Sequence, residues 1–568
     1  MIFCCLCCCE KMNSFLYQVI TLLLVIIETI NGDRVEILVP KGSIAGEKYS
    51  LNDGHSVTRF LGIPYAKPPL GKLRYRRPVL IEKWNQTIEA LHWPNSCYQK
   101  PEFLHRYNNK NFVEDCLYLN IWSPDVNVNE QNLKPVLIWI HGGAFTKGGT
   151  SDSLFDLERL AVMADAIMVS INYRLSGLGF FYSDQVDEIK GNQGLWDQVM
   201  ALKWVNENIR YFGGNPNAIT LMGNSAGSWA VSLHILSPVS RNLFNNAMML
   251  SGAANYYAVR KAEDIVPKTL NVIRSIGCAT EDDTVINESI VECMEQADVE
   301  KVENLSSIRS LVVVDNEFLP DDPISMIKSG NHKKNFNLLV STVEDEGSFI
   351  FARTNDSFGK EELSLNDAKS ILIKNIEFVN QDDKSYDTDA MLKTYFGRFN
   401  EFYDDTDLFK KQVGIAFGDL IIACPTLNFA KQLYKSDPST INVYQWFYKA
   451  KLGRVKDLCS KWGGTCHTDE LYPMFGKPFE QRQYFHNRER EISAEIIDFI
   501  KSFIRTGKPG QSHMEWQKYF MTNTGINDDI KMVITPYYEI ANNYRTYESF
   551  KFNLKQTECE IVWNALYQ

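Results

Sequence analysis

Five short apolar runs, separated by long segments of mixed character, restrict the fold of this chain more than any other feature. The runs are Val136–Ile140, Ile167–Ile171, Ala218–Met222, Asn337–Ser341 and Val443–Phe447. A continuous apolar run of about 4–8 residues indicates a strand that is buried on both faces. Helical patterns such as Leu195–Ile209 lie between the runs. This alternation predicts an α/β fold with a large, mostly parallel central sheet that is flanked by helices.

The composition and the absence of linkers indicate one large globular unit. Hydrophobic residues make up 45% and charged residues 23% of the 568 residues, and the net charge is −11. An acidic balance argues against a general nucleic-acid binder. No Pro- or Ser-rich linker interrupts the chain after Asp33, so we expect a single domain over residues 33–568. The charged, helical segments 255–335 and 355–435 are expected to be insertions that form a cap over the site.

The N-terminal segment resembles an export signal. Its apolar run Phe15–Ile27 follows Lys11 and has 13 residues, whereas a membrane-spanning helix needs about 20. We therefore predict a signal peptide over residues 1–32, starting at Met1 or Met12, and a secreted, extracellular protein. An uncleaved anchor is the alternative. Beyond this segment we identify no apolar stretch long enough to cross a bilayer, and we expect no stable membrane insertion.

Cysteines and glycosylation sequons agree with export. Five of the 13 cysteines lie in the predicted signal, and the remainder is an even number, which in an exported chain indicates disulfides. Their spacing does not favour a metal site, and we expect no metal and no cofactor. Four sequons are glycosylation candidates, at Asn85, Asn287, Asn304 and Asn355.

A candidate nucleophile follows the third apolar run. The run ends at Met222, the pentapeptide Gly223–Gly227 reads GNSAG, and a helical stretch, Ser228–Ile235, comes next. Gly-x-Ser-x-Gly between a strand and a helix predicts a tight turn that lifts the serine hydroxyl above the sheet edge. The turn also points the next backbone N–H at a developing oxyanion. Ser225 is the candidate nucleophile, and an inert structural turn is the alternative.

A second glycine loop follows the first apolar run. Its residues, His141–Phe145, read HGGAF. A Gly-Gly loop after a central strand can present backbone N–H groups to an oxyanion, which gives this loop a candidate role beside Ser225. We expect His141 itself to be structural, because it occupies the entrance of the loop.

A nucleophilic serine needs a base, and the base needs a carboxylate. In this fold class the serine comes first, then the acid, then the histidine. His467 follows a Gly-Gly loop after the strand Val443–Phe447 and is the best candidate base. The later histidines without such a turn are expected to pack on a helix (His234), to be solvated in a charged run (His332) or to lie among polar residues (His486 and His513).

Three adjacent carboxylates are candidates for the acid. Glu344, Asp345 and Glu346 lie just past the strand Asn337–Ser341. A loop at the carboxyl end of a parallel strand is where active-site groups gather. Periodicity does not choose among the three.

The chain resembles the type-B carboxylesterase and cholinesterase family of α/β-hydrolases over almost its whole mature length. The resemblance rests on Phe60–Ala66 with Pro68 and Pro69, Glu114–Asn120, His141–Gly143, Gly191–Leu195 with Asp197 and Gln198, Gly223–Gly227, Asp345–Ser348 and Gly464–His467. It implies the α/β-hydrolase fold and a serine hydrolase of small-molecule carboxylic esters. It also implies Ser225 as nucleophile, Glu346 as acid and His467 as base.

The same resemblance implies further site residues. The oxyanion donors would be the backbone N–H groups of Gly143, Ala144 and Ala226. By similarity, the disulfides would join Cys97 to Cys116, Cys278 to Cys293 and Cys424 to Cys559. Cys459 and Cys466 are left over, and we expect a local bridge between them beside His467.

Departures from the family concern substrate choice. Cholinesterases carry a glutamate before the nucleophile and a tryptophan in the loop that the first disulfide closes, whereas this chain has Asn224 and no tryptophan in Tyr98–Asp115. A quaternary ammonium binds best to an aromatic face, above all tryptophan. The segment Leu305–Val314, near the acyl pocket of the family, has no aromatic residue, which predicts room for larger acyl groups. We therefore predict a broad-specificity carboxylesterase. The alternatives are a cholinesterase-like or hormone esterase and, from another class, a non-catalytic adhesion relative.

Overall fold

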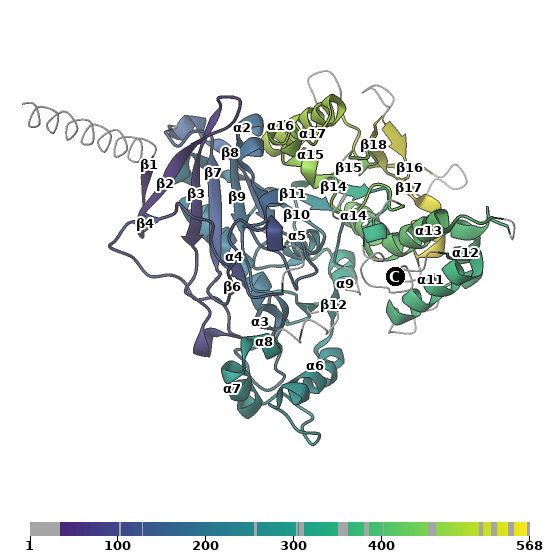
Figure 1. The fold of residues 1–568 in the computed structure, drawn as a ribbon, viewed down its shortest axis with the longest axis horizontal. Coiled ribbons are helices and arrows are strands. Elements are labelled where there is room, and N and C mark those ends of the chain that lie inside the picture. The colour runs from purple at the N-terminus through teal and green to yellow at the C-terminus, as the bar shows by residue number, and fades with distance from the viewer. Residues whose placement is uncertain are drawn as a thin grey trace, which may run out of the picture.

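The computed structural model describes residues 34–100, 104–127, 129–254, 258–302, 305, 312–349, 362–379, 386–400, 403–452, 462–510, 515–523, 531–542 and 550–564. Within this part of the chain, one 13-stranded sheet lies at the centre of the molecule with helices around it (Figure 1). Its strands, in spatial order, are β1 (Arg34–Val39), β2 (Gly42–Ser50), β3 (Ser56–Pro64), β7 (Tyr118–Ser123), β9 (Ile167–Ile171), β8 (Lys134–Ile140), β10 (Gly214–Asn224), β11 (Asn246–Leu250), β14 (Phe336–Val343), β15 (Ile441–Tyr448), β18 (Pro536–Ile540) and β19 (Phe550–Phe552). β4 (Ile88–Glu89) pairs with β2.

The central strands of the sheet are parallel, as the sequence predicts. The strands from β9 to β18 in this order run in one direction. The outer strands β1, β2, β3, β7 and β19 are added antiparallel. All five apolar runs form central strands, which confirms the predicted α/β fold. Because parallel strands end at the same edge, the loops after β8, β10, β14 and β15 meet there.

Burial on both faces explains why these runs are continuously apolar. In β8, Val136, Ile138 and Ile140 belong to one core, and Leu137 and Trp139 belong to the other. The first core includes residues of α4 (Gln193–Asn208) and α5 (Ala226–Leu236). The second includes residues of α2 (Glu158–Ala164) and α17 (Asn487–Thr506).

The two predicted helical insertions are present. The first contains α6 (Ala262–Ile276), α7 (Glu288–Gln296), α8 (Val299–Val302) and α9 (Pro323–Lys328). The second contains α11 (Leu365–Val379), α12 (Thr388–Phe396), α13 (Thr406–Gly418), η8 (Asp419–Ala423) and α14 (Cys424–Ser436). In Figure 1, α6 to α8 lie at the lower end of the molecule and α11 to α13 at the right. The second insertion has a separate core of its own, shared with η9 (Glu558–Val562).

One expectation about apolar stretches is wrong. Among the described residues, the continuous helix Thr406–Ser436, which comprises α13, η8 and α14, is long and apolar enough to cross a membrane. From the sequence, no such stretch was expected beyond the N-terminal segment. In the structure, 83% of the most apolar window of this helix is buried inside the protein. Burial in the core of the second insertion, and of Phe429 and Leu433 in the first core, accounts for its composition.

The three disulfides implied by the family resemblance are formed. They join Cys97 to Cys116, Cys278 to Cys293 and Cys424 to Cys559. Cys466 also takes part in a disulfide, and Cys459 lies outside the described residues.

Two of the four glycosylation candidates can be placed. Asn85 is exposed. Asn287 is half-buried and caps α7, where its Oδ1 accepts a hydrogen bond of 3.1 Å from the Ile290 N–H. Asn304 and Asn355 lie outside the described residues, as does the predicted signal over residues 1–32.

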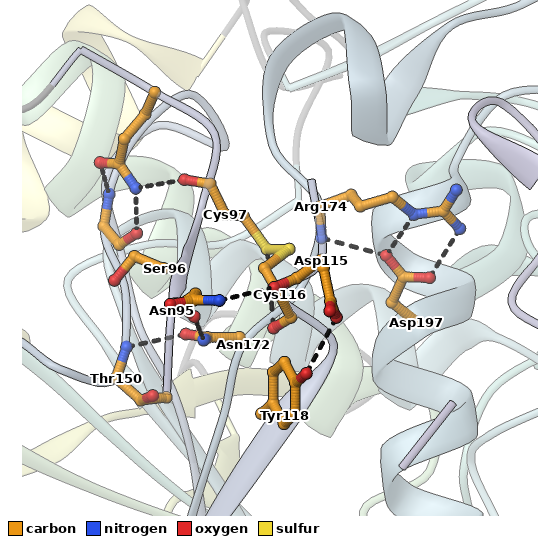
Figure 2. The surroundings of a disulfide bond; sticks show 12 residues. Asn95, Ser96, Cys97, Asp115, Cys116, Tyr118, Thr150, Asn172, Arg174 and Asp197 are labelled. Atoms are coloured by element: carbon orange, nitrogen blue, oxygen red, sulfur yellow. Dashed lines mark hydrogen bonds and ion pairs between the residues drawn. A yellow bond between two sulfur atoms is a disulfide. The ribbon is translucent and has the colours of Figure 1, made fainter. Parts of the chain in front are cut away.

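Figure 2 shows how the first disulfide is fixed beside the sheet. Asn172, which directly follows β9, donates from Nδ2 to the Asn95 carbonyl at 2.9 Å. Its Oδ1 accepts from the Thr150 N–H at 2.8 Å. A buried ion pair between Arg174 and Asp197, 2.7 Å from Nη2 to Oδ1, lies nearby. Asn172 thus ties the segment that enters the disulfide to the segment that follows β8.

Candidate active site

The strand-to-helix turn predicted around Ser225 is present. Ser225 lies between the end of β10 and the start of α5, with φ 57° and ψ −125°. A Cβ at Gly223 would lie 2.3 Å from the Gly227 carbonyl oxygen, and a Cβ at Gly227 would lie 2.1 Å from the Ile140 carbonyl oxygen. Neither position has room for a side chain. Ser225 is partly exposed although its flanking residues are buried, so its hydroxyl can reach a ligand.

The glycine loop after β8 lies against this turn. A Cβ at Gly142 would be 2.9 Å from Ser225 Cβ. The next residues have φ 113° at Gly143, 56° at Ala144 and 59° at Phe145. In the described part of the chain, the Gly143 and Ala144 N–H groups have no hydrogen-bond acceptor. Ala226 is the first residue of α5, where an N–H has no intrahelical acceptor. Three N–H groups beside Ser225 are thus available to an anion.

Aromatic packing holds this unusual loop. The ring of Phe145 lies 5.0 Å from that of Phe180, measured between centroids. His141 stacks on Tyr173 at 4.4 Å, and the Tyr173 hydroxyl donates to the His141 carbonyl at 2.8 Å. Burial lowers the pKa of His141 to about 4, so this imidazole is neutral at physiological pH. Its surroundings suit the structural role expected for it.

The loop closed by the first disulfide also supports the glycine loop. Gln99, which is buried, donates from Nε2 to the Gly148 carbonyl at 2.6 Å and accepts from the Gly148 N–H at 2.8 Å. A Cβ at Gly148 would lie 2.4 Å from His141 Nδ1. Gln99 therefore connects the disulfide loop to the segment that carries Gly143 and Ala144.

Among the three carboxylates after β14, Glu346 contacts the predicted base. Glu346 Oε2 lies 2.6 Å from His467 Nδ1, and its Oε1 accepts a hydrogen bond of 2.9 Å from the Val343 N–H. Both side chains are buried, His467 at 3% and Glu346 at 1% exposure. Glu344 instead pairs with Lys449 at 3.2 Å. The arrangement orients the imidazole through Nδ1 and leaves Nε2 for another partner.

Ser225 and His467 come from loops at the same sheet edge. Within the described residues, no hydrogen bond joins Ser225 Oγ to the His467 ring, and such contacts often tighten only when substrate binds. A direct link joins their neighbours instead, since Asn224 Nδ2 donates to Glu470 Oε1 at 3.0 Å.

Buried carboxyl groups surround the His467–Glu346 pair. Burial, followed by the negative charge of Glu346, raises the pKa of Glu470 well above its usual range. Burial raises the pKa of Asp345 to about 6 and that of Asp469 to about 7. Sequence reasoning singled out neither Glu470 nor Asp469. Their closeness to His467 in the sequence was the only available signal, and it does not show which way a side chain points.

The remaining histidines lie apart from this constellation. His234 is buried between Gln198 and Ser240, and burial lowers its pKa to about 3. The expectation that His332 is solvated is wrong, because the side chain is 3% exposed. Its Nε2 contacts Ser436 Oγ of α14 at 2.7 Å. His486 is exposed at the start of α17, and His513 lies outside the described residues. No group of three or more potential metal ligands occurs in the described ranges.

Comparison with known proteins agrees with the predicted fold. A family model described as "Carboxylesterase family" matches residues 33–561. Acetylcholinesterase of Leptinotarsa decemlineata is 31% identical over 508 residues, which cover 82% of this chain and 78% of that protein. Cholinesterase of Mus musculus is 33% identical over 501 residues, covering 83% and 80%. Acetylcholinesterase of Bungarus fasciatus is 31% identical over 496 residues, covering 84% and 79%.

Proposed function

Because the chain belongs to the carboxylesterase family of carboxylic ester hydrolases, we propose that it is a broad-specificity serine esterase that acts on small-molecule esters. Ser225 is the proposed nucleophile, His467 the base and Glu346 the acid. The observation that carries this proposal is the buried contact of 2.6 Å between His467 Nδ1 and Glu346 Oε2 at the sheet edge that carries the Ser225 turn.

The proposed reaction proceeds in two halves through an acyl-enzyme. Ser225 Oγ attacks the ester carbonyl while His467 Nε2 takes its proton, and Glu346 stabilises the resulting imidazolium. His467 then gives the proton to the leaving alcohol. In the second half, His467 takes a proton from water as the water oxygen attacks the acyl carbonyl. The bond between the acyl group and Ser225 Oγ then breaks, and His467 returns the proton to Ser225 Oγ.

The backbone supplies the electrostatic part of the proposed mechanism. The N–H groups of Gly143, Ala144 and Ala226 would bind the oxyanion that forms in each half-reaction. Losing one such donor costs about 3 kcal/mol of barrier. The positive φ at Gly143 and Ala144 belongs to a loop that Phe145 and Gln99 hold in place, which favours an oxyanion site that needs little reorganisation.

Two features favour broad specificity over choline esters. Asn224 is neutral and already bonded to Glu470, so it offers no negative charge to a cation. The loop Tyr98–Asp115 contains no tryptophan to face a quaternary ammonium.

A cholinesterase-like esterase is the second candidate. The relatives named acetylcholinesterase and cholinesterase favour it. So does Phe349, whose ring centroid lies 6.1 Å from that of His467 and could replace a tryptophan as the aromatic face.

The wider organisation is part of the same proposal. We propose an export signal over residues 1–32, one domain over residues 33–568, and a secreted glycoprotein. Three disulfides support an oxidising compartment. The exposure of Asn85 supports glycosylation at that sequon.

The test compares two thioesters with the same acyl group, acetylthiocholine and an uncharged analogue, with and without an organophosphate. Hydrolysis of both without preference, lost on inhibition, is the expected result. Strong preference for the choline ester would replace the first candidate by the second. Neither turnover nor labelling, from folded protein, would overturn both.

A further inference from the structure

The proposed base sits in a tight turn of four residues, Cys466–Asp469. The Asp469 N–H donates to the Cys466 carbonyl at 3.0 Å, which closes the turn. His467 occupies its second position and Thr468 its third. Thr468 has φ 81°, whereas His467 has no positive φ. A closing bond with positive φ only at the third position defines a type II turn.

Threonine is an unfavourable residue at this position. The third residue of a type II turn is usually glycine, because a side chain with positive φ crowds its own backbone. A β-branched residue there is a conformational outlier. Such backbone strain persists only where the surrounding structure enforces it.

Hydrogen bonds of Asp469, the last residue of the turn, hold Thr468 in its strained conformation. Besides the backbone bond, Asp469 Oδ2 accepts a hydrogen bond of 2.8 Å from the Cys466 N–H. Asp469 is thus the donor in one hydrogen bond to Cys466 and the acceptor in the other, and both bonds span His467 and Thr468. Asp469 is 5% exposed, so water competes little for these two hydrogen bonds.

The preceding part of the loop is anchored without comparable strain. Asp345 Oδ2 accepts from the Thr465 N–H at 2.8 Å, and the Asp345 N–H donates to the Thr465 carbonyl at 3.0 Å. The positive φ there, 69°, belongs to Gly464, where a Cβ would lie 2.0 Å from Asp345 Oδ2. The strain of the base loop is therefore concentrated at Thr468, next to His467.

We propose that Asp469 is a positioning residue for His467. Its two hydrogen bonds to the backbone of Cys466 hold the strained turn closed and so keep the imidazole against Glu346. This rests on the proposed function only in naming His467 as the base. The Asp469 side chain bonds to the Cys466 backbone and not to His467. If its role is to hold the strained backbone of Thr468, a substitution that removes this strain should make the Asp469 side chain dispensable.

Three variants test this role, and in one of them a second substitution is expected to restore the lost activity. Asp469→Ala should lower kcat about 100-fold while KM changes little, because displacement of a catalytic group by about 1 Å has effects of that size. Asp469→Asn should retain most activity, since its amide oxygen can still accept from the Cys466 N–H. In the double variant Thr468→Gly/Asp469→Ala, kcat should recover at least about tenfold, because glycine adopts the turn without strain.

A control and an independent readout complete the design. Asp322→Ala removes a part-buried carboxylate that accepts backbone N–H bonds at the start of α9, and should change stability without changing kcat. The downfield proton resonance of the His467–Glu346 hydrogen bond should be lost in Asp469→Ala and return in the double variant. This signal needs no turnover, so it separates failure of the positioning role from failure of the proposed esterase function.

Two results would overturn the proposal. The first is wild-type kcat and an unchanged resonance in Asp469→Ala. The second is a double variant that stays as impaired as Asp469→Ala, which would make the role of the carboxylate electrostatic. If Asp469→Ala does not fold, kcat is instead compared between Thr468→Gly and the double variant Thr468→Gly/Asp469→Ala. The proposal predicts similar kcat in these two variants, and a much lower kcat in the double variant would overturn it.

Discussion

Asn224 Nδ2 donates a hydrogen bond of 3.0 Å to Glu470 Oε1, which joins the residue before the proposed nucleophile to a residue three positions after the proposed base. Both side chains are buried. Burial and then the negative charge of Glu346 raise the pKa of Glu470 well above its usual range, which favours the protonated form of this side chain. The serine turn and the base loop are therefore linked by a buried side-chain hydrogen bond.

This link predicts the outcome of placing a carboxylate at position 224. Asn224→Glu puts a second acid against Glu470, and the pair will share one proton, so that its single negative charge is held in a buried hydrogen bond. We expect the preference for acetylthiocholine over an uncharged thioester to change less than about threefold, because a cation also needs the absent tryptophan face. Asn224→Gln, which keeps the amide, is the control. A large gain in choline preference would contradict the account.

Removing the charge of Glu346 should impair catalysis without unfolding the protein. Glu346→Gln keeps the shape of the side chain but stabilises neither the correct tautomer nor the imidazolium, and we expect kcat to fall about 10³- to 10⁴-fold. Glu344→Gln is the matched control, since Glu344 pairs with Lys449 and not with His467. Steady-state kinetics and thermal melting measure the two effects. Wild-type activity in Glu346→Gln would make the acid assignment wrong.

The raised pKa of Asp469 makes stability depend on pH. Burial raises this pKa from 3.8 to about 7, so between these values the folded state keeps a proton that the unfolded chain releases. The contribution of Asp469 to the free energy of unfolding is therefore greatest below about pH 4 and decreases as the pH rises through 7. Relative to wild type, Asp469→Asn should gain stability from pH 4 to pH 8, by on the order of 4 kcal/mol.

Urea unfolding at several pH values measures this gain. Asp437 is the opposite control, because hydrogen bonds from Thr440 and Ser439 and the charge of Lys334 lower its pKa to about 2. Asp437→Asn should lose stability relative to wild type as the pH rises from about 2 to about 4, and the difference should then stay constant at higher pH. A difference between Asp469→Asn and wild type that is the same at every pH would refute the assigned protonation.

The contact between Gln99 and Gly148 predicts a role for the disulfide loop in catalysis. Gln99→Ala removes two hydrogen bonds that hold the end of the glycine loop. We expect the rate of acylation to fall about tenfold, a fraction of the effect of losing an oxyanion donor. Asn206→Ala also removes two side-chain bonds to backbone carbonyls, from α4, and should leave the rate unchanged. Stopped-flow acylation kinetics distinguish the two, and equal rates in both variants would exclude the role.

The central strands could be predicted from the sequence because both of their faces are buried. In β8, Leu137 and Trp139 contribute to one core and their neighbours to the other, so the run is apolar throughout. The edge strand β1 (Arg34–Val39) alternates between exposed and half-buried residues and has no such run. It was not predicted, because its alternating pattern is that of a half-buried edge strand and differs from the continuous apolar runs of the central strands.

Contacts between distant segments could not be predicted. His332 lies in a charged run, yet Ser436, 104 residues further on, contacts its ring and the side chain is buried. Asn224 and Glu470 are separated by 246 residues, and no local pattern relates them. Motifs and their positions after strands singled out Ser225 and His467, whereas the choice of Glu346 over Glu344 and Asp345 rested on the family resemblance, because three adjacent carboxylates carry no local pattern that separates them.

The most direct test is to find which residue an organophosphate labels. The wild-type protein is inactivated with the reagent, digested, and the modified peptide is sequenced by mass spectrometry. The account predicts one adduct per chain, on Ser225, formed in proportion to the loss of esterase activity, and no adduct in Ser225→Ala. Complete inactivation with the adduct on another residue, or equal labelling of folded Ser225→Ala, would contradict it.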